Sequence, residues 1–288
     1  MLPALPVLLA VTLSTAPTPP VLSELPKPEG IYELKHDFWG DGAVTAVAGT
    51  GWLLSEVAFK RQFAPTECRW CEQTGSTDTL NGFDAWGRGM RWENTATAAK
   101  LSDLTGMVLM PLTMVGGEAY LALKNRAASE LPTDYLIILE STALAGLFNQ
   151  AVKFAVARER PYAHFAALAG TSMTASPDDN VSFFSGHTNL AFVLTVATGT
   201  VAELRGYEGR WVIWAVGLPL SVATAYLRVA ADKHYLTDVL VGALSGSAFG
   251  FLVPTVFHGR GAWKPISRSD FEAQLTAGPG GLAVVGKF

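Results

Sequence analysis

The chain has 288 residues, a formal net charge of −4 and a mean hydropathy of +0.26, with 49% hydrophobic and only 16% charged residues. A typical soluble domain is about a quarter charged, so this composition favours one membrane-embedded or very apolar helical domain. The slightly acidic balance provides no broad basic surface, and we expect no nucleic-acid partner. The sequence shows no repeat, no heptad seam, no P-loop and no Rossmann glycine fingerprint.

The N-terminal residues 1–16 form a short apolar run that ends in Ser-Thr-Ala and is followed by Pro-Thr-Pro-Pro. This pattern predicts a secretory signal peptide with a small-residue cleavage site, although the run begins without a lysine or arginine. An uncleaved anchor is the alternative, for which the run is short. Residues 17–39 are predicted to be a proline-rich linker, residues 40–258 a helical domain, and residues 259–288 a C-terminal extension.

Apolar segments long enough, or nearly long enough, to cross a bilayer recur along the domain. They are residues 42–59, 104–123, 135–157, 188–202, 211–227 and 236–257. Two of these segments contain a glutamate, Glu56 and Glu140, whose side chains would have to face the interior of a bundle. We therefore predict an all-α fold, a membrane-embedded bundle of approximately six helices. Buried helices of a soluble periplasmic protein are the alternative.

The two cysteines, Cys68 and Cys71, have the spacing C-x-x-C. This spacing is compatible with a disulfide, a redox pair or half of a metal site. A zinc site would need two more ligands, and no nearby His or Cys pair supplies them. A thioredoxin-like redox pair would need a βαβ context, which is absent. A small structural disulfide in an exported loop is the prediction.

Two cations lie seven residues apart in the segment Lys153-x6-Arg160-Pro161. This spacing is two helical turns, so we expect both side chains on one helix face. Pro161 is expected to end that helix, because its ring restricts Arg160 and removes a donor. Arginine and lysine together suit phosphate, but alone this segment is also typical of a charged cap on a membrane helix.

The tripeptide Ser185-Gly186-His187 directly precedes an apolar run and is predicted to open a helix. The glycine would let the backbone approach an anion closely. Free N–H groups and the positive end of the helix dipole would then face that anion. By itself, such a tripeptide is usually only a helix-starting turn.

A third motif, Arg228-x5-His234-x3-Asp238, places a histidine and an aspartate four residues apart. If a helix starts near Lys233, His234 and Asp238 are neighbours on its surface. Asp238 can then take the proton on one ring nitrogen and leave the other free as a nucleophile. Alone, such a pair is usually a structural hydrogen bond. Three cations around two histidines predict a site for a multiply charged tetrahedral anion, a phosphoryl group being transferred.

The pattern K-x6-RP, SGH and R-x5-H-x3-D resembles the type 2 phosphatidic acid phosphatase and vanadium haloperoxidase superfamily, in its membrane lipid phosphatase branch. The resemblance implies an all-helical core, a reaction without metal or other cofactor, and a phosphohistidine intermediate. It implies that His234 is the nucleophile, Asp238 its orienting partner and His187 the general acid. The phosphate-binding groups that it implies are Lys153, Arg160, Ser185, the Gly186 amide and Arg228.

Two positions depart from the family pattern. Phe184 stands where a proline usually precedes Ser-Gly-His, and Leu227 stands where a serine usually precedes the arginine. Neither missing residue attacks or protonates, so the core chemistry is expected to survive. The missing hydroxyl beside Arg228 affects how that guanidinium is held or how the substrate enters.

The functional hypothesis is hydrolysis of a phosphate monoester or diphosphate, with a phosphorylated lipid and the bilayer as partners. One alternative is a soluble periplasmic non-specific acid phosphatase. Another is a vanadate-dependent haloperoxidase, since the same cage can hold vanadate. A non-catalytic membrane protein that binds phosphate or lipid is the third, although binding alone requires neither a nucleophile nor its orienter.

The segment map brings the motifs together, because an up-and-down bundle places the ends that carry them on one membrane side. We expect that side to be the periplasmic face of a bacterial-type inner membrane, with residues 42–59 not crossing the bilayer. Lysine and arginine counts do not decide the orientation.

Overall fold

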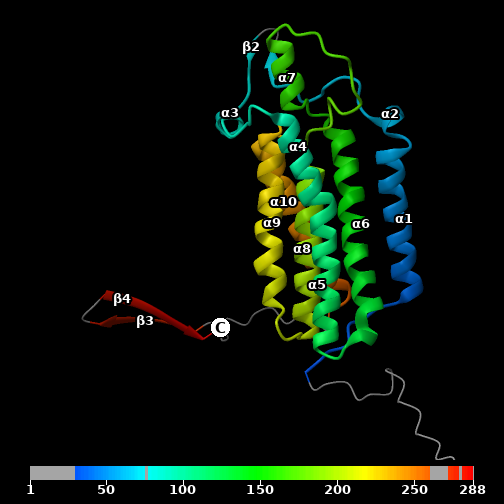
Figure 1. Ribbon diagram of the computed structural model, residues 1–288, viewed down its shortest axis with the longest axis vertical. Coiled ribbons are helices and arrows are strands. Elements are labelled where there is room, and N and C mark those ends of the chain that lie inside the picture. The colour runs from blue at the N-terminus through cyan, green and yellow to red at the C-terminus, as the bar shows by residue number, and fades with distance from the viewer. Residues whose placement is uncertain (1–29, 75–76, 260–271, 279–280, 288) are drawn as a thin grey trace, which may run out of the picture.

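The computed structural model describes residues 30–74, 77–259, 272–278 and 281–287. Long helices dominate the described residues, which confirms the all-α prediction (Figure 1). The predicted signal peptide, residues 1–16, lies outside the described residues, as do residues 17–29 of the predicted linker.

The bundle is built from long helices that run side by side (Figure 1). They are α1 (Phe38–Val57), α4 (Thr95–Asp103) continuing through the π-helical turn η2 (Leu104–Leu109) into α5 (Met110–Lys124), α6 (Leu131–Val156), α8 (Gly186–Arg205), α9 (Trp211–Ala230) and α10 (Leu236–Leu252). Two short helical turns flank them, η3 (Ala128–Glu130) before α6 and η4 (Val253–Phe257) after α10.

Shorter elements lie at one end of the bundle, at the top of Figure 1. They are α2 (Lys60–Phe63), β1 (Gln73–Thr74), β2 (Thr77–Asp78), α3 (Gly82–Arg88) and α7 (Pro161–Leu168). We call this group the cap. Strands β1 and β2 pair antiparallel. The C-terminal extension contains a second antiparallel pair, β3 (Glu272–Gly278) and β4 (Gly281–Lys287), in which Glu272 lies opposite Lys287.

Among the described residues, four helical stretches are long and apolar enough to cross a membrane, which indicates a membrane protein. They are Thr95–Lys124, Ala128–Val156, Trp211–Ala230 and Leu236–Phe257. The predicted segment 188–202 lies within α8, which is not among them. Helix α8 packs against α6, α9 and α10, so most of its side chains are buried by protein. Such a position tolerates polar residues that lipid would not.

Helices α8 and α10 approach each other closely along a line of glycines on α10. A Cβ atom built on Gly246 would lie 2.4 Å from the carbonyl oxygen of Asn189, and one on Gly242 would lie 2.8 Å from that of Ser185. Small residues permit such close backbone contact between membrane helices. The contact brings the starts of both helices together, and the Ser185 amide donates to the Asp238 carbonyl at 3.1 Å.

The end of the predicted linker is held against the bundle, at the end opposite the cap. The Tyr32 amide donates to the carbonyl of Arg205, and the Lys35 amide to that of His258, both at 3.1 Å. Leu34 is buried in the core. Residues 30–37 therefore pack onto the bundle instead of forming a loose linker, and the first helix begins at Phe38, two residues before the predicted boundary.

The structure corrects the expectation that Lys153 and Arg160 share one helix. Helix α6 ends at Val156, where Ala157 adopts a left-handed conformation with φ 51°. Arg160 is extended, with ψ 151°, and Pro161 begins α7 instead of ending α6. The physical reason is that proline fits the first position of a helix and forces the residue before it into extended geometry.

The predicted disulfide is confirmed, since Cys68 and Cys71 are bonded to each other within the cap. The loop that it closes pairs with the segment after α6. The Arg69 amide donates to the Ala157 carbonyl at 3.0 Å, and the Glu159 amide to the Trp70 carbonyl at 3.2 Å.

Candidate active site

A cavity of about 280 Å³ lies where the bundle meets the cap. Helix ends far apart in the sequence contribute to it, as the segment map predicted. The predicted site residues that line it are Lys153 of α6, Arg160 before α7, His187 of α8, Arg228 of α9 and His234 before α10. Asp238, Ser185 and Gly186 lie beside this cavity without lining it.

The three predicted phosphate-binding cations differ in how firmly they are held. Arg160 donates from Nε to the Asp178 carbonyl at 2.7 Å and from Nη1 to the Lys233 carbonyl at 3.2 Å. Arg228 is 6% exposed and its Nε has no hydrogen-bond partner among the described residues. Lys153 is also buried, and no described carboxylate lies within 4.0 Å of its ammonium group. An anion that binds in the cavity can therefore accept hydrogen bonds from Nε of Arg228 and from the ammonium group of Lys153.

Charged residues outside the motifs also line the cavity. Lys60 bridges Glu56 at 2.6 Å and Asp178 at 2.7 Å. Burial opposes the ionised form of Asp178, but Arg160 and Lys60 outweigh it and lower the pKa of that carboxyl. Burial, Arg160 and Arg228 lower the pKa of Lys233. The sequence offered no motif for Lys60 or Asp178, because their elements meet the site only in three dimensions.

His234 is buried in the loop that leads into α10. Its Nδ1 lies 2.8 Å from the carbonyl oxygen of Ser182, so Nδ1–H donates there and Nε2 is left for the cavity. Asp238 is further away, with Oδ2 3.5 Å from Nδ1. Burial, reinforced by Arg160 and Arg228, lowers the pKa of His234 well below its usual range. The imidazole is therefore neutral and nucleophilic.

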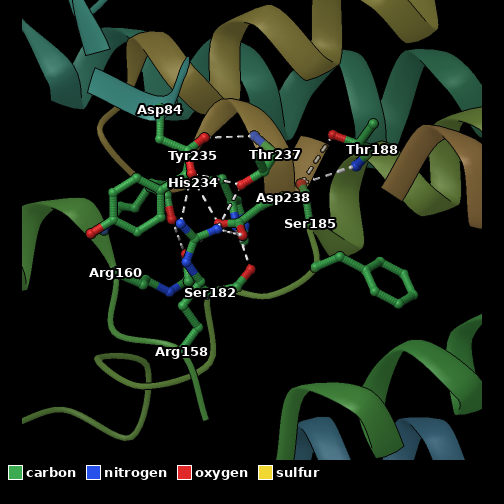
Figure 2. Close-up of polar contacts among 12 residues, drawn as sticks. Asp84, Arg158, Arg160, Ser182, Ser185, Thr188, His234, Tyr235, Thr237 and Asp238 are labelled. Carbon is green, nitrogen blue, oxygen red and sulfur yellow. Dashed lines mark hydrogen bonds and ion pairs between the residues drawn. The ribbon is translucent and has the colours of Figure 1, made fainter. Parts of the chain in front are cut away.

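Asp238 is held on both oxygens (Figure 2). Its Oδ2 accepts from the Ser182 hydroxyl at 2.5 Å and from the Tyr235 amide at 3.0 Å. Its Oδ1 accepts from Nη1 of Arg158 at 2.7 Å. The same Ser182 thus contacts Asp238 through its hydroxyl and His234 through its carbonyl, which links the two predicted partners.

Arg158 is the centre of a fully buried polar network that sequence reasoning missed (Figure 2). Its guanidinium donates to Asp84 at 2.7 Å and also to Glu72. The rings of Trp70 and Tyr235 lie 4.2 and 4.1 Å from its Cζ atom. Arg158 therefore ties the loop of the disulfide and α3 to the start of α10.

His187 lies in the first turn of α8, and its Nε2 is 2.8 Å from Oδ1 of Asp103. Arg228 Nη1 is 3.4 Å from the same oxygen and 3.1 Å from the Ser102 hydroxyl. Asp103 thus connects the predicted general acid to a predicted phosphate ligand. It lies 84 positions before His187 and outside the three motifs, so no sequence signal identified it.

Ser185 and Gly186 shape the start of α8, which confirms that this tripeptide opens a helix. The Ser185 hydroxyl is buried and accepts from the Thr188 amide at 3.4 Å and hydroxyl at 3.0 Å. A Cβ atom on Gly186 would lie 3.1 Å from both Asn149 Oδ1 and Lys153 Nζ. The absence of a side chain at Gly186 leaves room for the Lys153 ammonium.

A family model described as the PAP2 superfamily matches residues 134–262, a little under half of the chain. The matched region contains all three motifs. No solved structure matches the chain. The matched region, residues 134–262, is thus similar to the PAP2 superfamily, whose activities are of phosphatase or haloperoxidase type.

Proposed function

We propose that this protein, which matches the PAP2 superfamily over residues 134–262, is a metal-independent phosphatase that hydrolyses a phosphate monoester or diphosphate of a lipid through a phosphohistidine intermediate. The observation that carries the proposal is the position of His234. Its neutral imidazole lies in one cavity with Lys153, Arg160 and Arg228. Such a cavity combines a nucleophile with the charge that a transferring phosphoryl group requires.

In the first step, the Nε2 lone pair of His234 attacks phosphorus, and the bond between phosphorus and the leaving oxygen breaks. Burial and Arg228 lower the pKa of His187 to about 4, and the negative charge of a bound phosphate raises it again. His187 is therefore protonated in the complex and gives that proton to the departing oxygen. Lys153, Arg160 and Arg228 neutralise the equatorial oxygens, which is the role that Mg²⁺ has in many phosphoryl-transfer enzymes.

In the second step, a water oxygen attacks phosphorus and the P–N bond breaks, returning the electron pair to His234. His187 now accepts the proton of the water, as microscopic reversibility requires. Inorganic phosphate and the original protonation states result. Asp238 and the Ser182 carbonyl keep Nδ1 of His234 protonated, so that Nε2 remains the nucleophile throughout.

Two features support a lipid substrate at the periplasmic face of an inner membrane. The cavity lies at the ends of membrane-spanning helices, where the phosphate of a lipid can enter while its tail stays in the bilayer. The disulfide lies in the cap at the same end, and disulfides persist in oxidising compartments. A reporter fusion after Ala166, in α7 of the cap, should therefore report the periplasm. A cytoplasmic signal would overturn this orientation.

The experiment that tests the activity measures phosphate release from phosphatidic acid in detergent with EDTA present. Wild type should be active, His234→Ala should lose turnover, and an acid-labile phosphoenzyme should be trapped only in wild type. The control is His164→Ala, which removes another buried imidazole that does not line the cavity. A wild-type protein that hydrolyses neither phosphatidic acid nor isoprenyl diphosphate would overturn the proposal. Bromide oxidation on added vanadate would then identify a haloperoxidase.

A further inference from the structure

A second, smaller cavity of about 90 Å³ adjoins the first on the side of the bundle interior. Helices α1, α6 and α8 and the turn η2 enclose it. Glu56, Lys153 and His187 line both cavities, whereas His234 lines only the larger one. The α1 wall, with Trp52 and Glu56, lies outside the residues that match the superfamily.

Two of the residues that line the smaller cavity each have a buried polar atom without a partner. Nε2 of Gln150 and Oδ1 of Asn189 are buried without a hydrogen-bond partner among the described residues, and each residue is only 2% exposed. The Nδ2 atom of the same Asn189 amide already has a partner, since it donates to the Ala145 carbonyl at 3.1 Å. Leaving such groups unsatisfied is unfavourable, so a ligand that pairs with both gains affinity.

Two other polar side chains of this wall already donate hydrogen bonds elsewhere. Thr142 donates from its hydroxyl to the Ile138 carbonyl at 2.7 Å. Asn149 donates from Nδ2 to the Phe184 carbonyl at 2.8 Å. Gln150 and Asn189 therefore add a neutral donor and a neutral acceptor to the ammonium group of Lys153, which also lines this cavity.

The position of the cavity identifies which part of a substrate it receives. Phosphoryl transfer places the attacking and leaving atoms roughly in line on opposite sides of phosphorus. With His234 as nucleophile, the leaving oxygen lies away from His234 and next to His187, which protonates it. The smaller cavity has His187 in its wall and lacks His234, so it lies on the leaving-group side.

We propose that this cavity binds the first atoms of the leaving group and recognises a hydroxyl group there. A hydroxyl can accept from Gln150 and donate to Asn189 at once, whereas an ester carbonyl can only accept. The volume exceeds the roughly 10–15 Å³ that one water needs but is too small for an acyl chain. The preferred substrate class is a phosphomonoester of a polyol with a free hydroxyl near the scissile oxygen. This inference rests on the proposed phosphatase function.

The test compares two substrates in detergent: a 1-acylglycerol 3-phosphate, which has a free 2-hydroxyl, and its 2-deoxy analogue. Wild type should favour the hydroxyl substrate by about tenfold in kcat/KM, the range of one or two hydrogen bonds. Gln150→Met and Asn189→Leu, two changes of nearly constant volume, should each reduce that preference to near one. Thr198→Val is the matched control, because Thr198 also has a buried, unpaired hydroxyl on α8 but lines neither cavity.

The ratio of the two kcat/KM values separates recognition from folding, since a loss of folded protein lowers both values together. Equal rates for both substrates in wild type would overturn the inference while leaving the phosphatase proposal intact. A preference that survives both substitutions would overturn it as well. A wild type that hydrolyses neither substrate nor phosphatidic acid would instead overturn the phosphatase proposal itself.

Discussion

Nη1 of Arg158 donates to Oδ1 of Asp238 at 2.7 Å, and both side chains are completely buried. This contact joins the cap to the start of α10, next to His234. Arg158 lies two positions before the predicted phosphate ligand Arg160, yet it does not line the cavity that Arg160 lines. In the proposed mechanism, Arg160 binds the phosphate and Arg158 holds Asp238, which lies beside the proposed nucleophile His234.

Arg158→Lys should therefore lower both stability and turnover. A lysine cannot reach Glu72, Asp84 and Asp238 together, and an uncompensated buried carboxylate costs about 3–5 kcal/mol. Thermal unfolding and kcat, measured in the same detergent, provide the check.

Arg88→Lys is the control for Arg158→Lys. Arg88 pairs with Asp232 at 3.3 Å in the same cap, but its side chain is 31% exposed, and such pairs contribute at most about 1 kcal/mol. Equal losses of stability in the two variants would contradict the assignment of Arg158 as the anchor of Asp238.

Gly186→Ala should raise KM and cause only a small loss in the free energy of unfolding. The new methyl group would lie 3.1 Å from Lys153 Nζ, and the flexible lysine would move out of its place in the cavity. Gly116→Ala on α5 is the control, because a Cβ atom there meets nothing within 4 Å. Steady-state kinetics across substrate concentration distinguish the two effects, and an unchanged KM in Gly186→Ala would argue against this position for Lys153.

The pH dependence should respond to the charge of Arg160. Burial, with the nearby cations, lowers the pKa of His234, so its neutral form persists at acidic pH. Removing one cation in Arg160→Gln favours protonation and raises the pKa of His234. Because the protonated imidazole cannot attack, the acid limb of kcat/KM should move to higher pH. Arg160→Lys keeps the charge and should leave the limb in place. Identical limbs in wild type and Arg160→Gln would contradict the nucleophile assignment.

Reduction of the disulfide should lower the midpoint temperature of unfolding and leave turnover nearly unchanged. The loop between Cys68 and Cys71 carries Trp70, which stacks on Arg158, but no residue of this loop lines the catalytic cavity. Closure of so short a loop contributes about 2 kcal/mol or less. Thermal unfolding of wild type with and without reductant is the measurement. The double variant Cys68→Ser/Cys71→Ser should not respond to reductant, and an equal response there would rule out the disulfide as the cause.

Much of the candidate site was predictable because its motifs are local in sequence. Helix ends at Lys153, His187 and Arg228 were predicted to meet, and one cavity contains all three side chains. The exception was the segment from Lys153 to Arg160. A spacing of seven is compatible with one helix, but the proline after Arg160 favoured a new helix start over a helix end.

The helical class, the disulfide-compatible cysteine spacing and the order of the reactive side chains follow from the chain alone, because each depends on residues close together in it. The groups that support those side chains come from the packing of distant segments. Asp103 beside His187, Arg158 beside Asp238 and the Ser182 carbonyl beside His234 are all separated from their partners by 50 or more positions. Such contacts depend on how α4, α8, α10 and the segment after α6 pack in space, and no local pattern of residues predicts that packing.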